Sequence, residues 1–259
     1  TQLEYNLSLT FDGRKSVGDN PYEIKNTGYG NGNPGHQLEE ESHGTHVAGI
    51  LAANRVNKKG VNGVAENVQL MALRAVPDGD EYDKDIALAI RYAVDQGAKV
   101  INASFGKKFS PNASWVQEAL RYAAAKDVLF VHAAGNDGVD LDLPENPNFP
   151  NDIYSLTETT SENNYLSVGA LTPYYGPDMI ASFSNYGKKG VDIFAPGDEI
   201  FSTLPNSNYG VEGGTSMAAP AVAGMAALIR SLYPQLTAVQ VKGIILDSGL
   251  SIPMKVRVG

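Results

Sequence analysis

The sequence predicts an α/β protein with three layers, in which a mostly parallel β-sheet carries helices on both faces. The first supporting observation is that strand-like and helix-like segments alternate repeatedly along the chain, as in a parallel sheet with crossover helices. The second is that 259 residues suffice for one domain with a sizeable core, and no repeat or linker divides them. We therefore expect residues 1–259 to form a single domain.

The expected elements follow in chain order. In residues 3–11 every second position is apolar, which is typical of a half-buried strand. Residues 12–42 are rich in Gly, Asn, Asp and Pro and are expected to form a long loop, with Ser42 as N-cap of a helix through Ala53. The other expected strands are 68–76, 99–104, 128–133, 165–171 and 191–194, and the other expected helices are 85–96 (ended by Gly97), 113–126, 217–232 and one from Thr237 to near Gly249.

The composition excludes several classes of protein and of binding partner. A hydrophobic fraction of 42% with 19% charged residues is that of a globular protein. The net charge of −9, without a basic cluster, argues against a nucleic-acid partner, and no apolar run approaches the length of a membrane span. Because the chain has no cysteine, it has neither a disulfide scaffold nor a cysteine nucleophile.

Residues 213–220 (G-G-T-S-M-A-A-P) run directly into a small-residue apolar segment with helix-forming composition. Ser216 therefore lies in or just before a first helical turn, where backbone N–H groups and the helix dipole favour a developing negative charge. Pro220 is expected in the first turn, where an N–H has no intrahelical partner to lose. Taken alone, Ser216 could equally be an ordinary N-cap serine.

Three further segments accompany this one: H-G-T-H-V-A-G at 43–49, N-A-S-F-G at 102–106 and A-A-G-N at 133–136. In this order and spacing, the four segments resemble the subtilisin-like serine peptidases, or subtilases, over residues 35–258. The resemblance implies the subtilisin-like α/β fold and a secreted serine endopeptidase, so we expect an extracellular or periplasmic location. Subtilases are typically made with upstream segments, and many relatives have a further C-terminal segment. We therefore expect the chain to be trimmed at both ends.

The resemblance also implies the roles of individual residues. His43 would be the general base and Ser216 the nucleophile, and the Asn136 amide would complete the oxyanion hole with the Ser216 backbone N–H. His46 is expected to be structural. A zinc site on His43 and His46 is disfavoured, because zinc-binding helices space their histidines four apart with a glutamate between them.

Two segments are expected to line the primary specificity pocket, one of which would also pair with the substrate backbone. Their small side chains suggest a roomy pocket with a preference for large apolar groups. The expected substrate-binding residues are Ser104, Phe105, Gly106, Ala133, Ala134 and Gly135.

Calcium is common in the family, and acidic residues cluster at 78–85 and 137–142. Neither cluster follows a loop pattern with a known ligand register, so we expect acidic surface loops, no metal site and no cofactor.

The sequence departs from the family at the catalytic aspartate, which subtilases carry at the end of an apolar strand upstream of the histidine. No such segment precedes His43, and Asp247-Ser248-Gly249 is expected to be a helix C-terminus. We therefore expect weak or no activity, an altered sheet, and no carboxylate of the same chain bonded to His43 Nδ1. Residues 3–11 and 254–258 could supply strands, and two copies could exchange strands as a homodimer. The alternative function is a catalytically inactive pseudopeptidase that binds peptides.

Overall fold

The structure is a computed structural model that describes residues 13–35, 41–76, 81–152 and 164–259. The strand expected at residues 3–11 lies outside the described residues. Among the described residues, a short 3₁₀ helix, η1 (Gly13–Val17), comes first, residues 18–35 are largely irregular, and α2 (His43–Ala52) follows.

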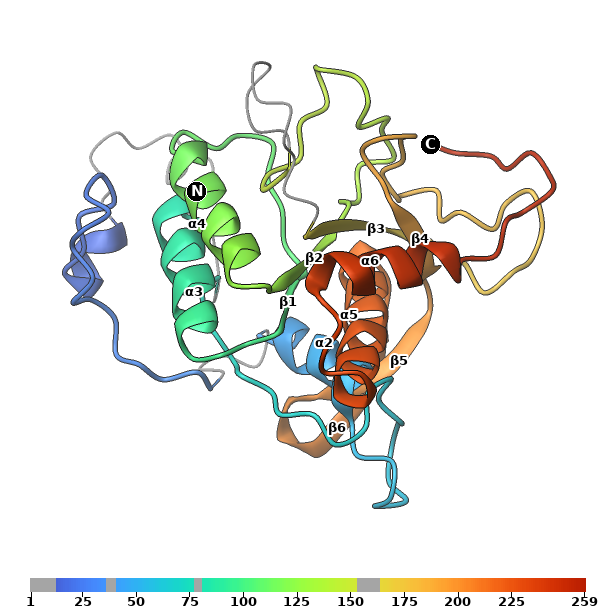
Figure 1. Cartoon of the computed structure of the whole chain (residues 1–259), viewed down its shortest axis with the longest axis horizontal. Coiled ribbons are helices and arrows are strands. Elements are labelled where there is room, and N and C mark those ends of the chain that lie inside the picture. The colour runs from blue at the N-terminus through green and yellow to red at the C-terminus, as the bar shows by residue number, and fades with distance from the viewer. Residues whose placement is uncertain (1–12, 36–40, 77–80, 153–163) are drawn as a thin grey trace, which may run out of the picture.

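Four parallel strands form the central sheet, in the order β1 (Val100–Ala103), β2 (Leu129–Ala133), β3 (Tyr165–Leu171) and β4 (Ile193–Pro196). Helices cover both faces (Figure 1): α3 (Asp83–Asp95) and α4 (Ala113–Ala125) on one, α5 (Thr215–Leu232) and α6 (Ala238–Asp247) on the other. The expected three-layer α/β architecture is thus confirmed, and most boundaries differ from the expected ones by two residues or fewer.

The strands are apolar on both sides because each face of the sheet has its own core. In β2, Leu129 and Val131 point into the cluster formed with α5 and α6, while Phe130 belongs to the cluster with α3 and α4. All three side chains are fully buried. A polar substitution on either side of β2 would therefore remove a core contact.

Residues 68–76, predicted as a strand, form no strand in the structure, and that prediction was wrong. Among the described residues, β1 pairs with β2 only, and β1 and residues 68–76 both line a cavity of about 1640 Å³. A strand needs a neighbouring backbone to take up its N–H and C=O groups, and the described chain offers none here. Leu70, Met71 and Leu73 consequently remain exposed. The unpaired edge of β1 in the described chain agrees with the expectation of an altered sheet. Residues 254–258, which were expected as a possible strand, are irregular.

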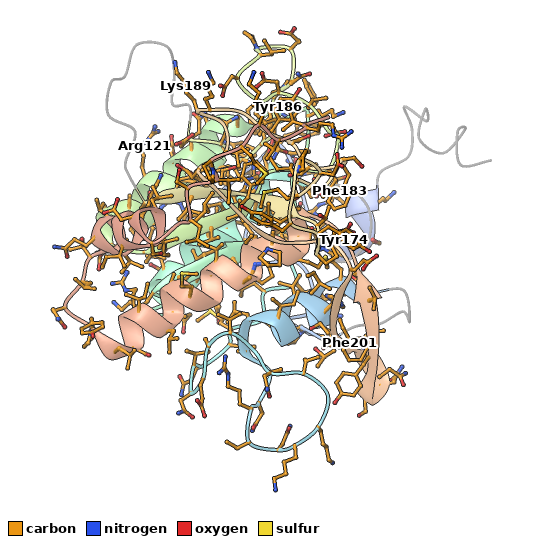
Figure 2. All side chains as sticks on the ribbon, turned by 90° about the vertical axis from the view of Figure 1, so that its right-hand side faces the viewer. Arg121, Tyr174, Phe183, Tyr186, Lys189 and Phe201 are labelled. Carbon is orange, nitrogen blue, oxygen red and sulfur yellow. The ribbon has the colours of Figure 1, made fainter. Side chains whose placement is uncertain are left out.

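An antiparallel hairpin, which the sequence interpretation missed, leads into α5. Its strands are β5 (Ile200–Leu204) and β6 (Asn208–Glu212), joined by η2 (Pro205–Ser207). Phe201 lies half exposed on this hairpin (Figure 2) and stacks on Tyr209 at 5.9 Å between ring centroids. The hairpin packs against α2 and so brings the end of β6 beside the start of that helix.

Pro220 lies in the second turn of α5 rather than in the first, so the expectation that it costs no hydrogen bond was wrong. The missing N–H would have bonded the carbonyl of Ser216, four residues earlier. That carbonyl instead accepts a hydrogen bond from Ser104 Oγ at 2.8 Å. The proline thereby leaves the backbone of Ser216 free to join α5 to the end of β1.

By length and composition, α5 is the one helix in the described part of the chain that could cross a membrane. More than half of it is buried within the protein, as for the core helix of a globular domain.

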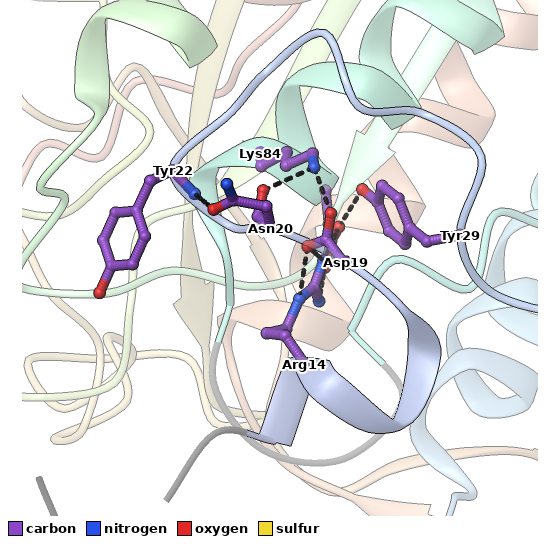
Figure 3. A network of polar contacts seen from close by, with 7 residues as sticks. Arg14, Asp19, Asn20, Tyr22, Tyr29 and Lys84 are labelled. Carbon is purple, nitrogen blue, oxygen red and sulfur yellow. Dashed lines mark hydrogen bonds and ion pairs between the residues drawn. The ribbon is translucent and has the colours of Figure 1, made fainter. Parts of the chain in front are cut away.

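A polar network holds the segment after η1 against α3 (Figure 3). Asp19 accepts hydrogen bonds from the Arg14 guanidinium at 2.5 and 2.8 Å and from the ammonium of Lys84, which is 1% exposed. Asp85 binds the same guanidinium and the Tyr29 hydroxyl. Since buried charges are stable only when paired, this network fixes residues 14–29 at the outer side of the domain.

Candidate active site

The large cavity runs along the whole of β1 and includes the carboxyl ends of β1 and β2, which is where parallel α/β sheets place their binding sites. Its lining brings together residues far apart in the sequence: His43 from α2, Ser104 after β1, Asn136 after β2 and Ser216 from α5. The three predicted catalytic residues therefore share one cavity.

Ser216 is the second residue of α5, so the expected place of this serine at a helix N-terminus is confirmed. Its hydroxyl donates to the carbonyl oxygen of Ser104 at 3.3 Å, while Ser104 Oγ donates back to the Ser216 carbonyl and accepts from Asn102. Gly214, with a φ of +154°, makes the turn into the helix, and its N–H is bonded to Gly197. The backbone of Ser216 is thus fixed from both sides, and within the described residues its hydroxyl makes one long hydrogen bond.

The orientation of the Asn136 amide follows from its hydrogen bonds. Its Oδ1 accepts from the Thr215 backbone N–H at 2.8 Å and from Thr215 Oγ1 at 3.0 Å. A backbone N–H can only donate, so the oxygen must face Thr215 and the NH₂ group must lie on the opposite side. The threonine hydroxyl is held in turn by the Gly135 N–H at 3.0 Å. The NH₂ group is therefore left available as a donor beside Ser216.

His43 opens α2 and is exposed at the cavity. Desolvation by the surrounding protein lowers its pKa, the charge of Glu212 raises it, and the charge of His46 lowers it again; the net shift is downward. The imidazole is therefore neutral near pH 7 and able to accept a proton. Among the described residues, no carboxylate is hydrogen-bonded to His43.

His46 is fully buried, three residues further along α2. Its Nε2 donates to the Gly210 carbonyl of β6 at 3.2 Å, and its Nδ1 has no partner in the described structure. This imidazole therefore joins the helix to the hairpin. Within the described residues, no group of three or more His, Asp or Glu side chains could hold a metal ion.

The residues expected to bind substrate occupy the same region. Ser104, Phe105 and Gly106 line the cavity after β1, and Ala133 and Gly135 line it after β2. Ala134 is fully buried and does not line the cavity; its carbonyl accepts hydrogen bonds from Asn148 and Asn185.

His132, which the sequence interpretation did not single out, supports this region from within β2. It is 1% exposed, and burial lowers its pKa to about 4, so the ring is neutral. Because a carbonyl can only accept, Nε2–H must donate to Phe105 O at 2.7 Å. Nδ1 lies 2.7 Å from the Tyr165 hydroxyl, whose single proton also faces the Pro150 carbonyl at 2.8 Å. The sequence feature that could have identified this residue is a single histidine within an otherwise apolar predicted strand.

The acidic residues that follow Asn136 bind backbone N–H groups and a lysine of neighbouring segments. Asp142 accepts the backbone N–H groups of Lys188, Lys189 and Gly190 at 2.8–3.0 Å, and these hydrogen bonds lower its pKa. Asp137 pairs with Lys108 at 2.6 Å across the rim of the cavity. These carboxylates thus have partners within the protein.

The fold and site together define an α/β protein with a serine, a histidine and an oriented amide around one cavity at the carboxyl ends of parallel strands. Comparison with known proteins gives the family: the subtilase family profile matches residues 10–253, and the chain belongs to the subtilase family of serine peptidases.

Individual relatives agree with this assignment. The chain is 42% identical over 195 residues to a thermophilic serine proteinase of Bacillus sp. (strain AK1), covering 75% of this chain and 44% of that protein. It is 37% identical over 191 residues to the major intracellular serine protease of Bacillus subtilis (strain 168), covering 73% of this chain and 55% of that protein. Among solved structures, it is similar to Sphericase with a TM-score of 0.72 and 30% identity, over 85% of this chain and 72% of that one. The chain spans about half the length of the two sequence relatives.

Proposed function

We propose that this chain carries the site of a serine endopeptidase, with Ser216 as nucleophile, His43 as general base and Asn136 as oxyanion donor. The observation that carries the proposal is the fixed Asn136 amide. Its NH₂ group is left free beside a serine hydroxyl at a helix N-terminus, with a neutral imidazole on the same cavity.

In the proposed reaction, Ser216 Oγ leaves its 3.3 Å hydrogen bond to Ser104 and attacks the scissile carbonyl, while His43 takes its proton. The carbonyl oxygen becomes negative and is stabilised by Asn136 Nδ2–H and the Ser216 N–H at the start of α5. His43 then protonates the leaving amine. Water releases the acyl group by the reverse steps.

We propose an extended polypeptide as the substrate. Its backbone would lie along residues 104–106, and one side chain would enter the space between these residues and residues 133–135. Ala133 and Gly135 leave room for a large apolar group. Phe105 is held there by the neutral His132, so this wall is expected to keep its position across the pH range of most assays.

Hydrolysis of a peptide p-nitroanilide with a large apolar residue before the scissile bond tests the function. We expect a slow rate that is lost in Ser216→Ala, because no described carboxylate bonds to His43. A rate that is undiminished in Ser216→Ala would reject the assignment of the nucleophile. A robust rate would contradict only the expectation of weak activity.

A peptide-binding pseudopeptidase is the second candidate, and one observation favours it. Ser216 Oγ is bonded to Ser104 rather than to His43, and His43 has no bonded carboxylate in the described chain. Binding of the same peptide without cleavage or covalent labelling would support this candidate. Covalent labelling of Ser216 would reject it.

We propose further that the unpaired edge of β1 is completed by strand exchange with a second copy of the chain. An edge facing a cavity of about 1640 Å³ leaves backbone groups open to another strand. Sedimentation at micromolar concentration should show a dimer, and a monomer under these conditions would contradict the proposal.

We propose that the reaction needs no cofactor and takes place outside the cell. Asp142 is already bonded to three backbone N–H groups, which argues against a calcium ligand there. Dialysis against EDTA should leave the rate and thermal stability unchanged, and a loss restored by calcium would reject this proposal. Export rests on the family resemblance and is tested by locating the protein in fractionated cells.

A further inference from the structure

Four hydrogen bonds join α2 to the β5–β6 hairpin. Three of them end on backbone carbonyls: Ser202 Oγ donates to the carbonyl of His46, Thr203 Oγ1 donates to that of Thr45, and His46 Nε2 donates to that of Gly210. The fourth hydrogen bond has a carboxylate as its acceptor, and its donor is the residue that precedes His43. These bonds place the end of β6 against the first turn of the helix.

The fourth bond runs from Ser42 Oγ to Glu212 Oε1, at 3.1 Å. Ser42 occupies the N-cap position of α2 but makes no capping hydrogen bond with its side chain. Its hydroxyl instead holds the Glu212 carboxylate at the helix N-terminus, where the helix dipole favours a negative charge. Glu212 therefore contacts the residue that precedes His43, and it lies four residues before Ser216 along the chain.

The charges around His43 are few in the described part of the chain. Glu212 and His46 are the two groups whose charges act on its imidazole. Glu41 and Arg74 also line the cavity, but they are paired with each other in an ion pair. Within the described chain, the Glu212 carboxylate is thus the negative charge that acts on His43 and that has no ion pair of its own.

We propose that Glu212 is a positioning residue for His43: it ties the first turn of α2 to the strand that leads into Ser216, and it supplies the negative charge beside the imidazole. This inference rests on the proposed role of His43 as general base. The imidazolium formed when His43 takes the Ser216 proton is stabilised by that charge, as a nearby carboxylate stabilises any cation.

The test is an NMR titration of the four histidines in the intact chain, with the His43 signal assigned by a His43→Gln variant. Glu212→Gln keeps an acceptor for Ser42 but removes the charge. We expect it to lower the pKa of His43, because it removes the nearby negative charge that favours the imidazolium. Glu41→Gln is the matched control and should leave this pKa unchanged, because Glu41 is neutralised by Arg74.

An unchanged His43 pKa in Glu212→Gln, or an equal shift in Glu41→Gln, would overturn the inference. If Glu212→Gln fails to fold, Ser42→Ala replaces it. The freed carboxylate should then move away and the pKa of His43 should fall, and an unchanged value would again overturn the inference. The titration needs no enzymatic turnover, so its failure is distinguishable from a failure of the proposed function. Where the chain reacts with a fluorophosphonate, the pH midpoint of that reaction should fall in Glu212→Gln as well.

Discussion

Replacing Thr215 with valine tests the orientation of the oxyanion donor. The substitution preserves shape but removes a hydroxyl that is fully buried, accepts the Gly135 N–H at 3.0 Å and donates to Asn136 Oδ1 at 3.0 Å. The Gly135 N–H loses the acceptor that it has in the described structure, and an unpaired buried donor costs about 1–3 kcal/mol. For a domain of this size, each kcal/mol lowers Tm by about 2–4 °C.

Urea unfolding and the rate of fluorophosphonate labelling measure the two consequences of Thr215→Val. We expect a loss of unfolding free energy within that range and slower labelling, because Asn136 keeps one of its two fixing hydrogen bonds. Thr215→Ser is the control: it retains the hydroxyl and should label at the original rate. Thr215→Val with the stability and labelling rate of the unmodified chain would refute the reasoning.

Three other predictions concern the buried network and the oxyanion donor. Asp19→Ala should lower the unfolding free energy by about 3–5 kcal/mol because it removes the carboxylate that pairs with the buried Lys84 ammonium, while Arg14 keeps its hydrogen bonds to Asp85, and Lys84→Met should restore part of the loss; full stability in Asp19→Ala would contradict this. Burial alone would raise the pKa of Asp19, but hydrogen bonds and charges from Lys84 and Arg14 outweigh it and hold the pKa below its usual range. Its stabilisation should therefore be complete above about pH 4 and be lost as the pH falls through the folded-state pKa, so unfolding titrations of Asp19→Ala should show a weaker acid dependence than those of the unmodified chain. Asn136→Ala should lower kcat about a hundredfold or more with little change in KM, since the amide meets the oxyanion mainly in the transition state; a loss confined to KM would point to substrate binding.

The central sheet was predictable because local signals and tertiary packing agree there. The strand at 165–171 was predicted at its observed boundaries, and β2 within one residue, because both are predominantly apolar and buried on both faces. Thr237 also caps α6 as predicted, with a full capping box to Gln240, because capping depends on near neighbours alone.

The errors arose where structure depends on distant partners. Residues 68–76 have strand composition, but pairing requires a neighbouring backbone that the described chain does not place there. The β5–β6 hairpin was missed because its exposed strands carry polar residues and glycine among a few apolar ones.

In the site, short motifs identified His43, Asn136 and Ser216, and the structure places all three on one cavity. Sequence alone could not show the partners that set their geometry. Glu212 is 169 positions from His43 along the chain, and the bond between Ser104 and the Ser216 carbonyl follows from a proline in the second helical turn. Such contacts depend on the fold and leave no local pattern.

The central claim is that Ser216 is a nucleophile activated by His43, and mass-spectrometric mapping of the fluorophosphonate adduct tests it most directly. The account predicts one modified residue, Ser216, with labelling strongly slowed in His43→Ala and unaffected in the variant Ser251→Ala, whose side chain is exposed and does not line the cavity. Modification of another serine, or a labelling rate at Ser216 that is independent of His43, would contradict it.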